Sequence, residues 1–214
     1  VQCSDAGGII TTVAGTGTAG YSGDGDLATS AKINATLAIT VDSSGNLFIA
    51  DASNYRIRKV DRTTGIITTV AGTGTAGYSG DGGLATNAQI SDVCGIAVDS
   101  SDNLFIADST NYRVRKIDKA TGIITTVAGT GTSAYSGDGG LATAAQLVDP
   151  RGINFDSSDN LFIADTSSHR IRRVDKTTGI ITRVAGTGVK GDSGDGGLAT
   201  NATLLGPDGV AVDS

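Results

Sequence analysis

The sequence of 214 residues contains no glutamate, methionine or tryptophan, and has only two prolines, two cysteines and one histidine. Long helices therefore lose two of their better-forming residues, glutamate and methionine. A metal centre built from several histidines cannot be assembled from this sequence, because His169 is the only one. No apolar run approaches the roughly 18 residues of a membrane span, so the sequence predicts no membrane insertion. It also shows no signal peptide or initiator methionine, and we expect Val1 to be a processed or truncated start.

The formal net charge of −6 argues against a general polyanion binder and makes nucleic acid an unexpected partner. The charges are not evenly mixed, however. Twelve of the 16 Lys and Arg residues fall in three short windows, 56–62, 113–119 and 170–176. These windows predict basic stripes on an otherwise acidic body, which keeps polyanion binding open as an alternative function.

The two cysteines, Cys3 and Cys94, are too few for a disulfide framework and lack zinc-site spacing. Within the repeat described next they take different positions in non-adjacent units. We therefore favour two separate thiols over a bond between them.

What the sequence does contain is a repeat. The ten residues Gly65–Gly74 recur almost unchanged from Gly8, Gly122 and Gly179, a spacing of 57 residues each time. A second block, Val41–Asp51, returns in the same phase. Repeats of fixed long period form units that bury their apolar faces only against their neighbours.

Each unit predicts four strands, at about 37–41, 46–50, 55–60 and 66–71, repeating every 57 residues. The run 104–107 is continuously apolar, which indicates a strand covered on both faces. The 32 glycines and the many Ser, Thr and Asp residues suit tight turns between short strands. Four antiparallel strands with short links form a meander, and meanders repeated at this period stack around an axis as propeller blades.

A long loop connects one unit to the next, for instance 129–146. It carries a Tyr-Ser-Gly-Asp-Gly-Gly stretch, and loops of this length are uncommon unless they function or pack as a unit. After the glycines, Leu84–Ala88 is expected to form one helical turn with Leu84 and Ala88 on the same face.

These blocks carry a family resemblance. The stretch 104–108 followed by 111–118 (Leu-Phe-Ile-Ala-Asp, then Asn-Tyr-Arg-Val-Arg-Lys-Ile-Asp) resembles the NHL repeat, in the long form common in secreted bacterial proteins. Tyr55 and Tyr112 depart from the usual His, and Ser168 from the usual Asn. The resemblance covers essentially the whole chain and implies an all-β, six-bladed propeller that binds partners.

The predicted fold class is thus an all-β β-propeller of four-stranded antiparallel blades, forming a single NHL-like segment over residues 1–214. Complete blades are expected at 37–71, 94–128 and 151–185, with partial blades at 1–14 and 208–214. The remaining blade would lack its second strand. We therefore expect a larger parent chain, six blades in all, or an oligomeric assembly or fibre that covers both ends.

Charged pairs recur at the second hairpin of each unit: Asp51/Arg56, Asp108/Arg113 and Asp165/Arg170. The functional interpretation is a ring of charged groups on one face. The structural one is a salt bridge that staples each hairpin, and repetition in every unit favours it.

The inter-unit loops supply the candidate binding residues. Tyr21, Tyr78 and Tyr135, with Asp81 and Asp138, are predicted to contact a partner, or else to anchor each loop to its own blade. Asp24 and Asp26 raise calcium as an alternative, but no loop matches a known calcium spacing, so no metal or cofactor is predicted.

The sequence therefore predicts a non-catalytic propeller at the cell surface or outside the cell, binding a protein or glycan through its repeated loops. A lyase or lactonase completed by residues elsewhere is the enzymatic alternative, although the single His169 reads as structural and the missing glutamate removes a ligand expected of propeller lactonases. Asn34 and Asn201 each begin a glycosylation sequon.

Overall fold

The computed structural model describes residues 9–213, which form three four-stranded antiparallel sheets in a row. The first blade contains β1 (Thr36–Val41), β2 (Leu47–Asp51), β3 (Arg56–Val60) and β4 (Ile67–Ala71). The second contains β5 (Val93–Val98), β6 (Leu104–Asp108), β7 (Arg113–Ile117) and β8 (Ile124–Ala128). The third contains β9 (Pro150–Phe155), β10 (Leu161–Asp165), β11 (Arg170–Val174) and β12 (Ile181–Ala185). Each sheet is a meander in chain order, so the predicted all-β propeller of antiparallel blades is confirmed.

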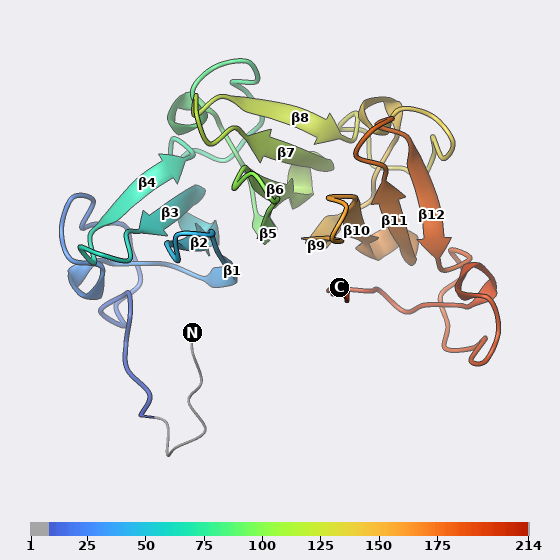
Figure 1. The fold of residues 1–214 in the computed structure, drawn as a ribbon, viewed down its shortest axis with the longest axis horizontal. Coiled ribbons are helices and arrows are strands. Elements are labelled where there is room, and N and C mark those ends of the chain that lie inside the picture. Colours follow the sequence, from blue (N-terminus) through green and yellow to red (C-terminus); the bar gives the residue numbers. More distant parts are fainter. Residues whose placement is uncertain (1–8, 214) are drawn as a thin grey trace.

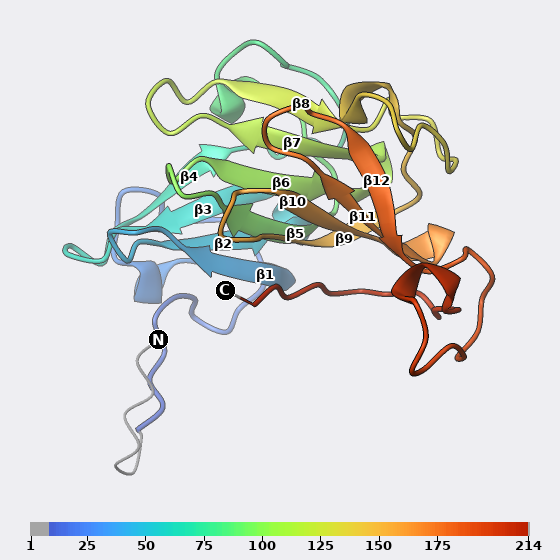
Figure 2. The same cartoon turned by 45° about the vertical axis from the view of Figure 1, so that its right-hand side comes forward.

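The sheets stand side by side along an arc, with their first strands toward the open centre (Figure 1). β5 lies between β1 and β9 and contacts both, which makes these the inner strands. The fourth strands β4, β8 and β12 lie on the outside of the arc, as the turned view also shows (Figure 2). No helix in the described residues has the length and apolar character needed to cross a bilayer.

Short 3₁₀ helices fill the connections. η2 (Ala52–Asn54), η4 (Ser109–Asn111) and η6 (Thr166–Ser168) join second to third strands. η1 (Ala28–Ser30), η3 (Ala85–Asn87), η5 (Ala142–Ala144) and η7 (Ala199–Asn201) lie in the long loops. The helical turn expected near Leu84 is η3, but its two apolar ends do not share a face: Leu84 is exposed and Ala88 is buried.

The arc has two faces, which lie at opposite ends of the strands and carry different connections. The turns between first and second strands and between third and fourth strands lie together, and we call this side the turn face. The 3₁₀ bends between second and third strands lie at the other end of the strands, on the bend face. The long loops leave the fourth strands and cross to the next inner strand.

The core lies between successive sheets. Ile96 of β5 and Ile153 of β9 occupy the same repeat position and are 6% and 7% exposed, because the preceding blade covers each. The equivalent Ile39 of β1 is 58% exposed. Apolar blade faces are therefore buried by neighbouring blades rather than within one sheet, as expected for a repeat protein.

Glycine is required where each fourth strand ends. Gly72 has a φ of +91°, and a Cβ there would overlap the carbonyl oxygen of Tyr55. Two residues later, a Cβ at Gly74 would overlap the guanidinium of Arg56. The repeated Gly-Thr-Gly sequence thus makes room for the bend residue and for the arginine beside it.

Partial blades were expected at both ends. Residues 9–14 and 207–213 are assigned to no strand. Gly152 N of β9 donates to Asp208 O at 2.9 Å, but neither segment forms a ladder of backbone hydrogen bonds with a described strand. The expected stub at Val1–Cys3 lies outside the described residues. The partial blades stay a prediction.

Candidate functional site

An arginine with no solvent exposure sits on the third strand of every blade: Arg58, Arg115 and Arg172. In the second blade, Nε and Nη2 of Arg115 donate to Asp81 Oδ1 at 3.0 and 2.6 Å. The same guanidinium donates to the carbonyl oxygens of Ser79 and Gln89, each at 2.8 Å. Arg115 therefore ties the middle of the long loop that precedes its own blade to the last part of that loop.

The loop tyrosines belong to the same arrangement. The Tyr78 hydroxyl donates to Asp81 Oδ2 at 3.0 Å, and the guanidinium of Arg113 lies over the ring, 3.6 Å from its centroid. Tyr21 with Arg56 and Tyr135 with Arg170 repeat this geometry. Cation–π stacking and the hydroxyl bond favour the anchoring alternative for these tyrosines. Tyr21 and Tyr78 still expose about two fifths of their surface, at 42% and 39%.

The aspartates of these loops are occupied as well. Asp81 Oδ2 accepts hydrogen bonds from the backbone and hydroxyl of Thr126, at 2.9 and 2.6 Å. Burial raises the pKa of Asp81, but the bonds from Thr126 and Arg115 outweigh it and the pKa is lowered. Asp138 likewise binds Arg172 and Tyr135. Both residues hold the loop in place through these bonds, and partner contact by Asp81 and Asp138 stays a prediction.

The long loop also closes the outer edge of the blade. Gly82 N donates to Ile124 O at 2.8 Å, and Ile124 N donates to Gly83 O at 3.0 Å. With the bond from Thr126 N to Asp81, these contacts pair groups that an outer strand would otherwise leave open. The loop length that the sequence left unexplained is accounted for by this edge pairing.

The predicted hairpin salt bridges pair each aspartate with the wrong arginine. Asp51 and Arg56 face each other in the β2–β3 register, yet Asp51 Oδ2 pairs with Arg58 Nη1 at 3.3 Å. Asp108 and Asp165 pair likewise with Arg115 and Arg172 rather than with Arg113 and Arg170.

The reason lies in where the side chains point. Arg56 turns away to donate to the carbonyls of Asn54 and Thr73 and to stack on Tyr21. Asp51, Asp108 and Asp165 have no solvent exposure, which also rules out a ring of charged groups made from them.

The calcium alternative does not fit the first loop. Asp24 Oδ1 binds Arg58 at 2.7 Å and its Oδ2 accepts from Tyr21 at 2.8 Å, so a guanidinium already neutralises this carboxylate. Asp26 is exposed and has no such partner set. Within residues 9–213 no three His, Cys, Asp or Glu side chains gather as metal ligands would.

The side chains of His169 and Cys94 both form hydrogen bonds with backbone groups. His169 holds the left-handed position after η6, with a φ of 56°, and its Nδ1 accepts the backbone N–H of Gly206 at 3.1 Å. Cys94 carries a free thiol that donates to the carbonyl of Asp92 at 3.4 Å, and burial raises its pKa. Cys3 lies outside the described residues.

The basic windows do not form the expected stripes. Arg58, Arg115 and Arg172 are buried, and Arg56, Arg113 and Arg170 donate to backbone carbonyls. Half of the twelve charges are thus used inside the fold. The others lie on the turn face, among carboxylates.

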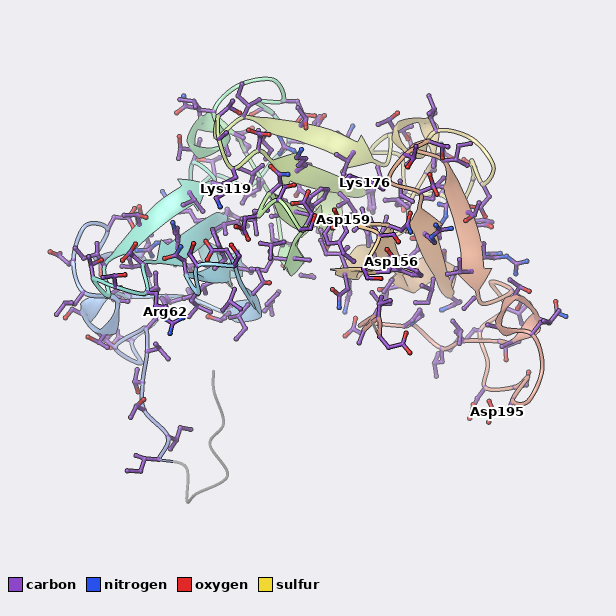
Figure 3. All side chains as sticks on the ribbon, viewed as in Figure 1. Arg62, Lys119, Asp156, Asp159, Lys176 and Asp195 are labelled. Carbon is purple, nitrogen blue, oxygen red and sulfur yellow. The ribbon has the colours of Figure 1, made fainter. Side chains whose placement is uncertain are left out.

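On the turn face, neighbouring blades are joined by a repeated clasp. Ser43 of the first blade donates its N–H and hydroxyl to Asp102 of the second, at 2.8 and 2.6 Å, and Lys119 Nζ binds Asp102 at 2.7 Å. Asp159 receives the same bonds from Ser100 and Lys176, and Figure 3 shows Asp159 and Lys176 between the second and third blades. These bonds lower the pKa of Asp102 to about 2.

Beside each clasp, a groove opens between two blades. The groove between the second and third blades has a volume of about 500 Å³, and that between the first and second about 330 Å³. Every residue that lines the smaller groove has its counterpart 57 residues later in the lining of the larger groove. The larger groove is lined by Phe105, Val127, Phe155, Leu161 and Val174, with Lys116, Thr126, Thr143 and Lys176 among its polar residues.

The larger groove contains an aromatic pair. Phe105 of β6 and Phe155 of β9 meet edge to face, with ring centroids 4.8 Å apart. Val98 takes the place of Phe155 in the preceding unit. These grooves could not be predicted from the sequence, because their walls come from different blades. The feature of the sequence that could have indicated them is a phenylalanine at the same position of each unit, at Phe48, Phe105 and Phe162.

Comparisons with known proteins agree with this architecture. The family described as the teneurin NHL domain matches residues 130–190. Human teneurin-1 is 32% identical over 99% of this chain and 9% of its own length. NHL repeat-containing protein 2 of cattle is 29% identical over 62% of this chain and 19% of its own length. The chain thus spans less than a fifth of each of these curated relatives.

A solved structure shows the same fold. It is described as an auxiliary nutrient binding protein from Bacteroides thetaiotaomicron, with a TM-score of 0.61 and 20% sequence identity. The match covers 84% of this chain and 43% of that one.

Proposed function

The chain belongs to the NHL-repeat family, as its motif blocks predicted, and we propose that it is a non-catalytic binding propeller that holds a protein or glycan partner outside the cell. The observation that carries the proposal is the pair of equivalent grooves on the turn face. A repeated surface of this kind suits a partner that contacts several blades at once. A single reaction centre, in contrast, needs one specialised set of residues.

The grooves have the properties of a binding surface. Pockets that hold ligands are concave and mostly apolar, with a few polar groups at fixed positions, and commonly measure about 300–1,000 Å³. Both grooves combine an apolar floor with lysine, threonine and aspartate at the rim. The clasps keep neighbouring blades in register beside each groove, so the surface is held in place before a partner arrives.

The loop tyrosines take a secondary part in this proposal. Their hydroxyls and ring faces are used within the fold, so they contribute to contact only through exposed ring edges. Partner contact through Tyr21, Tyr78 and Tyr135 stays a prediction, as does the position of the whole protein at the cell surface. Protease treatment of intact cells of the source organism tests the latter, because a surface protein is cleaved and an internal one is protected.

The binding surface can be tested with tryptophans introduced at the groove rim. Thr86 and Thr143 are exposed 3₁₀-helix residues that line the smaller and the larger groove. The double variant T86W/T143W should fill both grooves without disturbing the core. We expect it to lose binding to peptides and glycans that the unmodified chain captures on arrays.

Thr29 provides the matched control, because it holds the same repeat position but lines neither groove. T29W should bind as the unmodified chain does. Equal binding by all three proteins would place the contact surface elsewhere and overturn the proposal.

A further inference from the structure

We propose that each turn-face groove takes an apolar side chain flanked by a carboxylate, presented by an extended acidic segment of a partner protein. This inference rests on the proposed function and specifies the chemistry of its ligand. It follows from which charges in the grooves are already paired and which are not.

The carboxylates of the larger groove are committed to bonds within the protein. Asp99 Oδ1 accepts the backbone N–H groups of Ser101 and Asn103, and its Oδ2 accepts the Asn103 amide. Asp159 is held by Ser100 and Lys176 at 2.6 and 2.9 Å. Asp175 accepts bonds from Thr178 and pairs with Arg173. These carboxylates therefore offer little to a ligand cation.

The lysines of the third strands are not committed in this way. Lys116 Nζ lies 3.9 Å from Oδ2 of Asp118, which is beyond hydrogen-bond range. Lys59 forms no ion pair within the described residues, and its ammonium lies over the ring of Phe48, 5.9 Å from the centroid. Both lysines line their grooves beside apolar floors. Each groove lining contains three aspartates and two lysines, and within the described residues the ammonium groups of Lys59 and Lys116 are the ones left to donate a hydrogen bond to a ligand.

The apolar floor of the larger groove favours an apolar group on the ligand, beside the carboxylate. Val127, Phe155 and Val174 are half-buried in the free protein, so an apolar group that covers them removes further area from water. Phe105 and Phe155 meet edge to face in the lining of the larger groove, and aromatic side chains favour further contacts of this kind. A glycan that carries a carboxylate lacks the aromatic or branched aliphatic side chain that would cover this floor, so the lining favours a protein segment.

The probe for the test is acetyl-Asp-Phe-Asp-amide, titrated into the isotope-labelled chain and followed by amide chemical shifts. We expect shifts at groove residues, such as Val127 and Val174, and at their equivalents in the smaller groove, Val70 and Ile117. Acetyl-Asn-Phe-Asn-amide removes only the charge, and acetyl-Asp-Ala-Asp-amide removes only the aromatic ring. Each should bind several-fold more weakly than the first peptide.

Protein variants separate ligand chemistry from a general charge effect. K59Q/K116Q should weaken binding of acetyl-Asp-Phe-Asp-amide about 10-fold to 150-fold, since a hydrogen bond to a charged group contributes about 1.5–3 kcal/mol. K190Q makes the same kind of charge change on an exposed loop away from the grooves and should leave binding unchanged. Shifts confined to the bend face, or equal binding of the Asn and Asp peptides, would overturn the inference.

Failure of this inference can be distinguished from failure of the proposed function. If T86W/T143W abolishes partner binding while K59Q/K116Q does not, the grooves bind a partner of different chemistry. If neither variant affects partner binding, the turn face is not the binding surface and both proposals fall.

Discussion

Replacing the buried Arg115 by methionine should destabilise the protein strongly, because Arg115 and Asp108 form an ion pair with no solvent exposure. R115M keeps much of the side-chain volume but leaves the Asp108 carboxylate without a countercharge. It also removes the donors to the Ser79 and Gln89 carbonyls. Breaking a buried pair by removing one partner costs about 3–5 kcal/mol. For a chain of this length, each kcal/mol lowers Tm by about 2–4 °C, so we expect a fall of about 6–20 °C.

The assay is thermal and urea unfolding followed by circular dichroism, since the chain has no tryptophan to report by fluorescence. R115M/D108N removes the uncompensated charge and should recover part of the loss. R113M is the matched control: Arg113 is half-buried, stacks on Tyr78 and donates to two carbonyls, and its loss should cost about 1–2 kcal/mol. The reasoning is refuted if R115M unfolds within about 1 kcal/mol of the unmodified chain, or if R113M is the more damaging change.

Three further predictions concern the loops and the titrating carboxylates. Y78F, which loses the bond to Asp81 but keeps the stacked ring, should lower Tm less than Y78A does; equal losses would contradict a role for the ring. Burial raises the pKa of Asp159, but its bonds to Ser100 and Lys176 outweigh it and lower the pKa to about 2, below its ordinary 3.8. The ionised Asp159 therefore stabilises the fold above pH 3.8, and this contribution is lost as pH falls through 2. Urea unfolding should show this loss for the unmodified chain, whereas D159N has no such contribution to lose. Burial raises the pKa of Asp165 to about 6, where Oδ2 has no hydrogen-bond partner. The protonated Asp165 therefore stabilises the fold fully below pH 3.8, and this stabilisation is lost as pH rises through 6. In urea unfolding at several pH values, the free energy of unfolding of D165N should not show this decrease.

The repeat, the fold class and the strands could all be predicted from the amino-acid pattern. Strands predicted at 37–41, 46–50, 55–60 and 66–71 occur at Thr36–Val41, Leu47–Asp51, Arg56–Val60 and Ile67–Ala71. These features could be read because they depend on local patterns: apolar runs for strands, and Asp, Asn and Gly residues for turns. The internal repeat strengthened each assignment by showing it several times.

Which charged side chains meet depends on the packing of the loops against the blades, and could not be predicted. Asp51 and Arg56 are close in sequence and directly opposed across β2 and β3, yet the carboxylate pairs with Arg58, whose other partner Asp24 comes from a loop 34 residues earlier. Sequence distance could not reveal this, because the loop that brings Asp24 to Arg58 folds back over the outer edge of the blade. The grooves were hidden for the same reason, since Phe105 and Phe155 come together only when two blades pack. Contacts within a blade follow from the local pattern, whereas contacts between a blade and its neighbour or loop depend on how separate units pack in space.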